Sequence, residues 1–316
     1  MKEMDSRAFV LMVANVASST AVVLTNKWVF VQYQFRDGIA LTAFHFLCTF
    51  LGLLALIPLG VFTPQRLPFG KLLLLSLVFC VFVVTSNFSL LTNSMGIFQL
   101  SKVLSTPLLL LLSLVLPGPP SLRSPAALLS LALSCAGVAL ASVTDVSLSS
   151  IGAFLAIAGV LSQVLHQLRA SSLQIELSAD AMQLLFYQAF ISFFILCGVS
   201  FAEHQSGLFR ATVISPLNLP FEAILAILAS AVFAFSVNLS TFYVLRLTSP
   251  LSYSVLGHLK ICLGLVGGTL IFAEPISALR LAGIAMALLG ISWYTWVKHS
   301  ASSSPSPPPQ NKPKSA

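Results

Sequence analysis

Long apolar stretches separated by short polar ones fill most of the chain. Ten can be marked, and each approaches the roughly 20 residues that an α-helix needs to cross the hydrocarbon core of a bilayer. Proline and glycine lie in the gaps, where a helix ends easily. The stretches cover about 8–33, 39–60, 70–91, 96–117, 124–143, 150–169, 181–202, 222–245, 250–272 and 278–298. The pattern predicts an all-α membrane protein with ten transmembrane helices.

Residues 1–298 are expected to form one ten-helix domain, followed by a tail over 299–316. The tail is rich in Ser, Pro and Lys and lacks the apolar residues of a folded core, so we expect it to be disordered. The first apolar stretch continues through Asn26 and Lys27 without a small-residue cleavage site. This favours a retained helix over a signal peptide that is removed.

The composition agrees with this fold class. Hydrophobic residues make up 57% of the 316 and charged residues only 8%, whereas a soluble domain carries roughly 25% charged residues. The net charge is +7, but the basic residues are spaced singly between apolar stretches, which argues against a nucleic-acid surface. The chain is therefore expected to contact membrane lipid and no nucleic acid.

The distribution of lysine and arginine predicts the orientation, because cytoplasmic loops are enriched in both. With ten helices the two termini share one side of the membrane. The richer set of alternate loops and ends includes both termini, so we expect both termini in the cytoplasm, together with the tail. The richer set holds Lys2, Arg7, Arg66, Lys71, Arg123, Arg169, Arg246, Lys298, Lys312 and Lys314, and the poorer set holds Arg36, Arg210 and Arg280.

Motifs for metal binding or catalysis are missing from the sequence. The five cysteines lie far apart inside apolar stretches, with neither a disulfide framework nor zinc-ligand spacing. The chain has no Gly-x-Ser-x-Gly, no phosphate-binding glycine loop and no His-Glu-x-x-His. We expect no cofactor, no metal site and no enzyme activity.

Three lysines stand inside predicted helices and carry the functional argument: Lys27, Lys102 and Lys260. A lysine at a helix centre costs about 2.5–3.5 kcal/mol on insertion scales, so each must face a protein interior or a watery cavity. Lys27 and Lys102 lie close enough to helix ends for their ammonium groups to reach the interface instead. Lys260 lies about ten residues from either end of its stretch.

Acidic residues are placed where they cannot neutralise these lysines. All of them fall in predicted loops or at helix ends: Glu3, Asp5, Asp37, Asp145, Glu176, Asp180, Glu203, Glu222 and Glu274. A buried cation without a protein counter-ion implies an anion supplied from outside, and phosphate or carboxylate is the expected chemistry. The lack of deep carboxylates disfavours proton-driven export, which uses acidic relays, and favours exchange of one anion for another.

The two halves of the chain share a weak internal repeat. Asn87-Phe88-Ser89 precedes Lys102, and Asn238-Leu239-Ser240 precedes Lys260, with offsets of 151 (238 minus 87) and 158 (260 minus 102). A five-helix unit that is duplicated reverses its orientation and gives an inverted pair. We therefore expect two inverted five-helix repeats, at about 8–143 and 150–298, that present Lys102 and Lys260 to a shared cavity.

Helical spacing assigns neighbours to these lysines. On the stretch 96–117, Gln99, Lys102 and Thr106 are expected to form one polar stripe. On the stretch 250–272, glycines beside the lysine leave space for a bulky ligand, and an aromatic ring is placed either to stack on a base or to sit at the membrane interface. The residues of that second face are Tyr253, Gly257, Lys260 and Gly264, with His258 nearby. His45 and His166 are expected to make hydrogen bonds between helices.

Five longer strings resemble one known family. They are LTAFHF at 41–46, LTNKWVF at 24–30, NSMGIFQLSK at 93–102, MQLLFYQA at 182–189 and TSPLSYSVLGHLK at 248–260. The chain resembles the nucleotide-sugar and triose-phosphate translocators of the drug/metabolite transporter superfamily, and looks most like the plant UDP-sugar transporters and their solute carrier family 35 relatives. The resemblance extends over about 9–298.

This resemblance implies an antiporter of the Golgi membrane that exchanges a cytosolic UDP-sugar for a lumenal nucleoside monophosphate by alternating access. Lys260 matches a lysine that binds ligand phosphate, and Lys102 matches a phosphate-binding lysine of the triose-phosphate branch. Tyr187 and Gln188 fall where relatives carry a Phe-Tyr-Asn-Asn string for base recognition. The predicted substrate-binding residues are Asn26, Lys27, Gln99, Lys102, Thr106, Tyr187, Gln188, Asn238, Tyr253, Gly257, His258 and Lys260.

Two other functions remain open. A triose-phosphate or phosphoenolpyruvate exchanger of the plastid envelope would carry Lys-Arg at the second lysine, whereas this chain has Lys260-Ile261. A non-transporting membrane scaffold would tolerate loss of the lysine. Another endomembrane stays open as the address, and a homodimer stays open as the assembly.

Overall fold

The computed structural model describes residues 6–33, 35, 37–93, 98, 101–115, 124–142, 150–206, 219–272 and 277–303. Regular structure in these ranges is helical, and nine of the helices are long and apolar enough to cross a membrane. The helices are α1 (Ser6–Gln32), α2 (Gly38–Leu56), α3 (Phe69–Thr92), α5 (Ser105–Val115), α6 (Pro125–Ser142), α7 (Ser150–Glu176), α8 (Ala181–Ser206), α9 (Phe221–Leu247), α10 (Pro250–Phe272) and α11 (Ala278–Ser303). The all-α membrane class is confirmed.

The fourth predicted helix is broken rather than continuous. Residues 101–103 are helical, Leu104 is a turn, and α5 begins at Ser105. Pro107 explains the break, because its ring nitrogen carries no hydrogen to bond the carbonyl of Val103. Leu104 N instead donates to the Ser101 carbonyl at 3.2 Å, a tighter hydrogen bond than that of an α-helix. The α-helical hydrogen-bonding pattern is therefore interrupted directly after Lys102.

Three helices extend four or more residues past their predicted ends. α7 continues to Glu176, α8 to Ser206 and α11 to Ser303. The predicted disordered tail at 299–316 is therefore wrong for residues 299–303, because no proline interrupts the helix before Pro305. The remainder of that tail lies outside the described residues.

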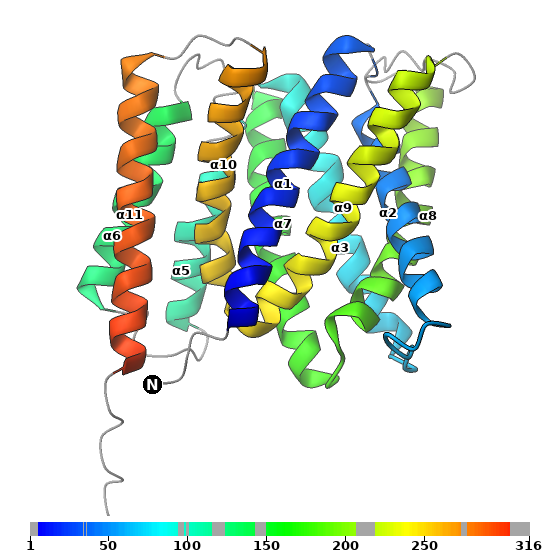
Figure 1. The fold of residues 1–316 in the computed structure, drawn as a ribbon, viewed down its shortest axis with the longest axis horizontal. Helices are drawn as coiled ribbons and strands as arrows, with labels where there is room; N and C mark the ends of the chain where they lie inside the picture. Colours follow the sequence, from blue (N-terminus) through cyan, green and yellow to red (C-terminus); the bar gives the residue numbers. More distant parts are fainter. Residues whose placement is uncertain are drawn as a thin grey trace, which may run out of the picture.

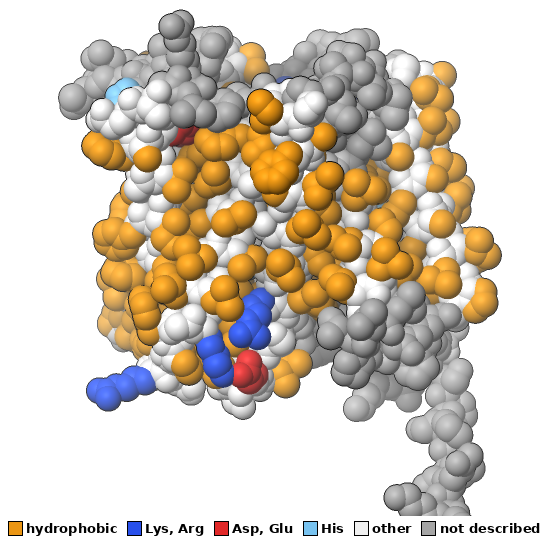
Figure 2. Space-filling model, turned by 180° about the vertical axis from the view of Figure 1, so that it is seen from behind, with side chains coloured by type: hydrophobic (Ala, Val, Ile, Leu, Met, Phe, Trp, Pro, Cys, Tyr) orange, Lys and Arg blue, Asp and Glu red, His pale blue; other side chains and the backbone are white. Residues whose placement is uncertain are grey.

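Helices from the two halves of the chain interleave (Figure 1). The closest pairs are α6 with α11, α1 with α9, α3 with α7, and α2 with α8, each joining the first half to the second. α1 begins and α11 ends at the same edge of the bundle, the lower one in Figure 1. Apolar side chains cover the middle of the face shown in Figure 2, with basic side chains gathered toward its lower edge and acidic ones near both edges, as expected for a lipid-facing surface.

The α6–α11 contact depends on glycine. A Cβ added to Gly137 would lie 2.2 Å from the backbone nitrogen of Ala287, and one added to Gly283 would lie 2.4 Å from that of Ala141. Small residues let the two backbones meet directly, which is a common way to pack helices in lipid. Both helices of this pair contact α10.

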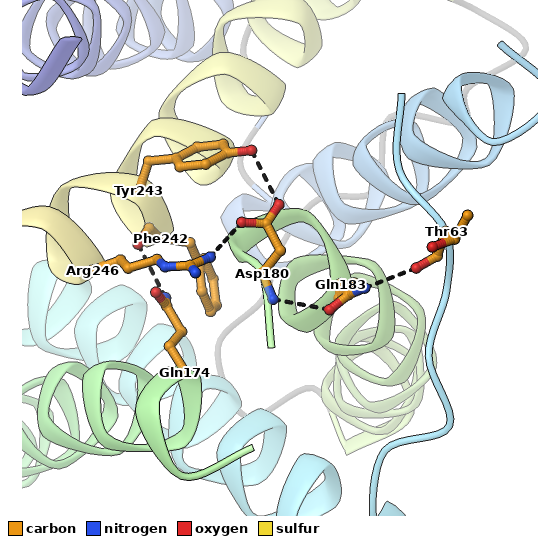
Figure 3. A network of polar contacts seen from close by, with 7 residues as sticks. All are labelled: Thr63, Gln174, Asp180, Gln183, Phe242, Tyr243 and Arg246. Carbon is orange, nitrogen blue, oxygen red and sulfur yellow. Dashed lines mark hydrogen bonds and ion pairs between the residues drawn. The ribbon is translucent and has the colours of Figure 1, made fainter. Parts of the chain in front are cut away.

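Polar side chains join the lower ends of α7, α8 and α9 (Figure 3). Asp180 precedes α8 and accepts hydrogen bonds from Arg246 at 2.5 Å and from the Tyr243 hydroxyl at 3.2 Å. Gln183 accepts from the Asp180 backbone N–H at 2.9 Å and donates to the Thr63 carbonyl at 2.8 Å. Gln174 donates to the Phe242 carbonyl at 3.0 Å. This edge of the bundle is closed by contacts between distant parts of the chain.

Candidate functional site

Lys260 lies near the middle of α10 on a face with open space. A Cβ added to Gly257 or to Gly264 would meet no atom within 4 Å. The Lys260 ammonium lies 4.5 Å from the centre of the Tyr253 ring and 3.4 Å from the Tyr253 hydroxyl. Tyr253 and Lys260 therefore share one face of α10, and no side chain or backbone atom of the described residues fills the space beside Gly257 and Gly264. The Tyr253 side chain is thus in direct contact with Lys260.

Lys102 lies at a small cavity between α3 and α7. The cavity has room for about one water molecule. The Lys102 ammonium lies 4.2 Å from the centre of the Phe98 ring. The polar residues of the lining are Ser86 and Ser89 from α3, Ser101, and Gln163 from α7. Serine hydroxyls and an amide beside an ammonium are donors suited to an anion.

In the described part of the chain, no acidic side chain forms an ion pair with Lys102 or Lys260. The five described carboxylates lie at helix ends or in the turn before α8: Asp37, Glu176, Asp180, Glu203 and Glu222. Two ion pairs are formed there, Lys71 with Glu176 and Arg246 with Asp180. Neither pair includes Lys102 or Lys260. The expectation that these two cations lack a carboxylate partner is confirmed for the described residues.

The first helix contributes Asn26 and Lys27 from its last two turns, and both are half-buried. The Asn26 side-chain carbonyl is buried and accepts no hydrogen bond from the described residues. That unmet acceptor is available to a donor that a ligand brings.

Thr106 and His258 face each other inside the bundle instead of lining the Lys102 cavity. The Nε2 atom of His258 lies 2.9 Å from the Thr106 hydroxyl, and its Nδ1 atom lies 2.7 Å from the Ser134 hydroxyl. The turn at Leu104 interrupts the predicted stripe between Lys102 and Thr106, and Thr106 is not among the residues that line the Lys102 cavity. Gln99, the third member of that stripe, lies outside the described residues.

Three other predicted residues make their hydrogen bonds elsewhere. The Tyr187 hydroxyl donates to the Gln65 carbonyl at 2.6 Å, at an exposed position. Gln188 is buried, and its side-chain oxygen lies 3.2 Å from the Nε2 atom of His166. The Asn238 side-chain amide donates to the Thr49 hydroxyl at 3.3 Å. The structure does not bring these three together with either lysine through a described contact.

His45 and His166 make the hydrogen bonds between helices that were predicted for them. His45 lies 2.8 Å from the Ser230 hydroxyl of α9, and His166 contacts Gln188 of α8. Both hydrogen bonds join different helices, which satisfies the buried rings within the lipid-embedded bundle.

Several residues of the site were not found from the sequence. Ser86, Gln163 and Phe98 line the Lys102 cavity, and Thr241 of α9 lies 3.1 Å from the Tyr253 hydroxyl. Ser86, Gln163 and Thr241 meet their neighbours from other helices, so spacing along one helix gives no signal for them. Phe98 stands four residues before Lys102 on the same predicted stretch, a spacing that could have indicated it. Ser89, by contrast, belongs to the repeated Asn-x-Ser string.

The fold and site define a multi-pass α-helical membrane protein with two cations that have no described carboxylate partner. The model of the Triose-phosphate Transporter family matches residues 7–295. The chain belongs to this family, which confirms the resemblance seen in its strings.

Curated relatives match along most of their length. UDP-xylose transporter 1 of Arabidopsis thaliana is 30% identical over 309 residues, covering 96% of this chain and 88% of that protein. UDP-rhamnose/UDP-galactose transporter 1 of the same plant is 32% identical, covering 89% and 81%. GDP-mannose transporter GONST5, also of Arabidopsis thaliana, is 28% identical, covering 89% and 83%. These relatives are named as transporters, not as enzymes.

A solved crystal structure has the same fold. It superposes with a TM-score of 0.75 at 14% identity and covers 94% of this chain and 99% of the solved chain. At that identity the likeness concerns the fold alone.

Proposed function

We propose that the protein is a nucleotide-sugar antiporter that exchanges a cytosolic UDP-sugar for a lumenal nucleoside monophosphate. The observation that carries the proposal is Lys260, a half-buried cation beside open space with no carboxylate among its described contacts. A phosphate ester supplies the missing negative charge. The named relatives, which carry UDP-sugars or GDP-mannose, support a nucleotide sugar as its source.

Exchange follows from the electrostatics of such a site. An empty site leaves the lysine charge uncompensated. The transporter therefore opens from one side of the membrane to the other more easily while a phosphate-bearing ligand is bound. A nucleotide sugar and a nucleoside monophosphate both carry phosphate, and each can screen the lysine in turn. No proton relay is needed for this cycle.

Alternating access fits two inverted repeats that move against each other. The packing supports this arrangement. If each helix of the first half is exchanged for its counterpart in the second, α1 for α7, α2 for α8, α3 for α9 and α6 for α11, the closely packed α1–α9 pair becomes the α7–α3 pair, which is also closely packed. The α2–α8 and α6–α11 pairs are each converted into themselves. Lys102 of the first repeat and Lys260 of the second are then counterparts at one shared site.

The remaining assignments follow the same reasoning. Both termini are proposed to be cytoplasmic because Lys and Arg gather in the loops on their side. The Golgi membrane is the proposed address, with membrane lipid around the bundle. A homodimer is compatible with this arrangement but is not needed for the site.

An exchanger of small organic phosphates is the second candidate, since the family is described as one of triose-phosphate transporters. Ile261, which packs against an apolar cluster, stands where plastid exchangers are expected to carry a second cation. One lysine with neighbouring aromatic and glycine residues suits a larger ligand with a single strong phosphate contact.

Transport into proteoliposomes tests the proposal. Vesicles loaded with uridine monophosphate are offered UDP-xylose, UDP-galactose, GDP-mannose or triose phosphate. We expect uptake of a UDP-sugar that depends on the internal nucleotide, and its loss in Lys260→Ala. Lys71→Ala is the matched control, because Lys71 forms an ion pair with Glu176 at the edge of the bundle. Uptake of triose phosphate alone would establish the second candidate, and undiminished UDP-sugar uptake by Lys260→Ala would refute the mechanism.

A further inference from the structure

A chain of polar contacts leads from α1 to the Lys260 ammonium. Asn15 Nδ2 lies 3.1 Å from the Thr241 hydroxyl of α9. That hydroxyl lies 3.1 Å from the Tyr253 hydroxyl, which in turn lies 3.4 Å from Lys260 Nζ. The chain thus crosses from the first repeat through α9 to α10.

The chemistry of each group sets the direction of these hydrogen bonds. A lysine ammonium only donates, so the Tyr253 oxygen accepts from it. The phenolic hydrogen is then available to the Thr241 oxygen, which also accepts from the Asn15 amide. Tyr253 is therefore held in the orientation that offers a lone pair to Lys260.

Asn15 is a buried amide whose donor group faces three oxygens of α9, including the Thr241 hydroxyl. Its side chain is 0% exposed, and its Nδ2 atom also contacts the Ser240 hydroxyl at 2.9 Å and the Val237 carbonyl at 3.2 Å. Its own Oδ1 atom is buried and accepts no hydrogen bond from the described residues. A buried amide with an unmet acceptor is a poor choice for packing alone, because an apolar side chain would leave nothing unsatisfied.

We propose that Thr241 and Asn15 are positioning residues that hold Lys260, through the Tyr253 hydroxyl, ready for the phosphate of the ligand. This inference rests on the proposed transport of phosphate-bearing ligands. The long lysine side chain loses rotamer freedom when it binds, and a lysine already oriented beside the open space of Gly257 loses less at that moment. The 3.4 Å contact is long for a hydrogen bond, so a phosphate oxygen can replace it.

A set of conservative variants tests this chain in proteoliposomes loaded with uridine monophosphate, with UDP-xylose or UDP-galactose as the substrate. Tyr253→Phe, Thr241→Val and Asn15→Ala each remove one link. We expect each to raise KM about two- to tenfold, the effect of one lost hydrogen bond, with a smaller change in kcat. Thr241→Ser restores the hydroxyl and is expected to return KM toward the wild-type value.

The double variant Thr241→Val/Tyr253→Phe separates positioning from general loosening. If Thr241 acts through the tyrosine hydroxyl, the double variant has the KM of Tyr253→Phe alone. Ser18→Ala is the matched control, because it removes a hydroxyl that joins the same two helices through Ser236 at 2.8 Å without touching Tyr253. We expect Ser18→Ala to leave KM unchanged.

Two results of the transport assay would overturn the inference: additive effects of Thr241→Val and Tyr253→Phe, or a wild-type KM for Thr241→Val. Thermal stabilisation of the purified variants by inorganic phosphate provides a readout that needs no transport. If the wild type takes up no nucleotide sugar, the proposed function fails. Equal stabilisation of the wild type and Thr241→Val by phosphate would remove the positioning role by itself.

Discussion

Lys260 and Lys102, the two lysines that we propose to share a ligand, are held in different ways. Lys260 lies within a continuous helix and contacts the hydroxyl of Tyr253. Lys102 lies just before a helix break, over a Phe98 ring that offers no hydrogen-bond acceptor, in a cavity lined by serines. We therefore propose a division of labour, in which Lys260 is pre-oriented for phosphate and the segment that bears Lys102 changes position during exchange.

The largest expected effect separates the two lysines directly. We predict that Lys260→Ala lowers kcat/KM for a UDP-sugar at least about 30-fold, because truncating one partner of a close charged contact costs about 2–5 kcal/mol. Lys102→Ala is predicted to lower it about tenfold, since its charge has a less direct contact. Radiolabelled uptake by proteoliposomes measures both. Equal losses would mean that the two lysines contribute alike to ligand binding.

The helix break is predicted to matter for movement more than for binding. Pro107→Ala restores the missing N–H and lets the helix continue through Leu104. We expect kcat for exchange to fall about threefold to tenfold while KM changes less, because the segment that bears Lys102 becomes stiffer; this corresponds to about 0.7–1.4 kcal/mol in the barrier. The variant is expected to be at least as thermally stable as the wild type. A raised KM with unchanged kcat would assign the break to binding instead.

The smallest predicted effect concerns the ring beside Lys102. Phe98→Leu removes a cation–π contact worth about 0.5–1 kcal/mol at an accessible site, or about two- to fivefold in affinity. Binding of uridine monophosphate to the purified protein, measured by titration calorimetry, provides the readout. Leu104→Ala, a change at an exposed neighbouring position, is the control and is expected to leave affinity unchanged.

Periodicity along single helices predicted much of this structure. The apolar stretches located the membrane helices, and the i, i+7 spacing of Tyr253 and Lys260 placed their side chains on one face, where they are in contact. The break at Leu104 was missed although the sequence carries its signal, since Pro107 lies inside the predicted stretch 96–117, where proline interrupts a helix. The partners of Thr106 and His258 were missed because each comes from a different helix.

Contacts between the two halves could not be read from the sequence at all. Asn15 and Thr241 are 226 residues apart, and their hydrogen bond depends on the packing of α1 against α9. Neither residue carries a charge that would be costly to place in lipid. The sequence therefore gives no signal for Asn15 and Thr241 of the kind that it gives for the lysines. Buried amides and hydroxyls give a weaker sequence signal than buried charges.

Ligand-dependent thermal stability tests the central claim most directly, namely that a cation without a described acidic partner binds the phosphate of the transported ligand. Purified wild type, Lys260→Ala and Lys71→Ala are compared with uridine monophosphate and with uridine, which lacks the phosphate. We predict that uridine monophosphate raises the Tm of the wild type and of Lys71→Ala but not that of Lys260→Ala, and that uridine raises none. An equal rise in Lys260→Ala, or an equal rise with uridine, would contradict the claim.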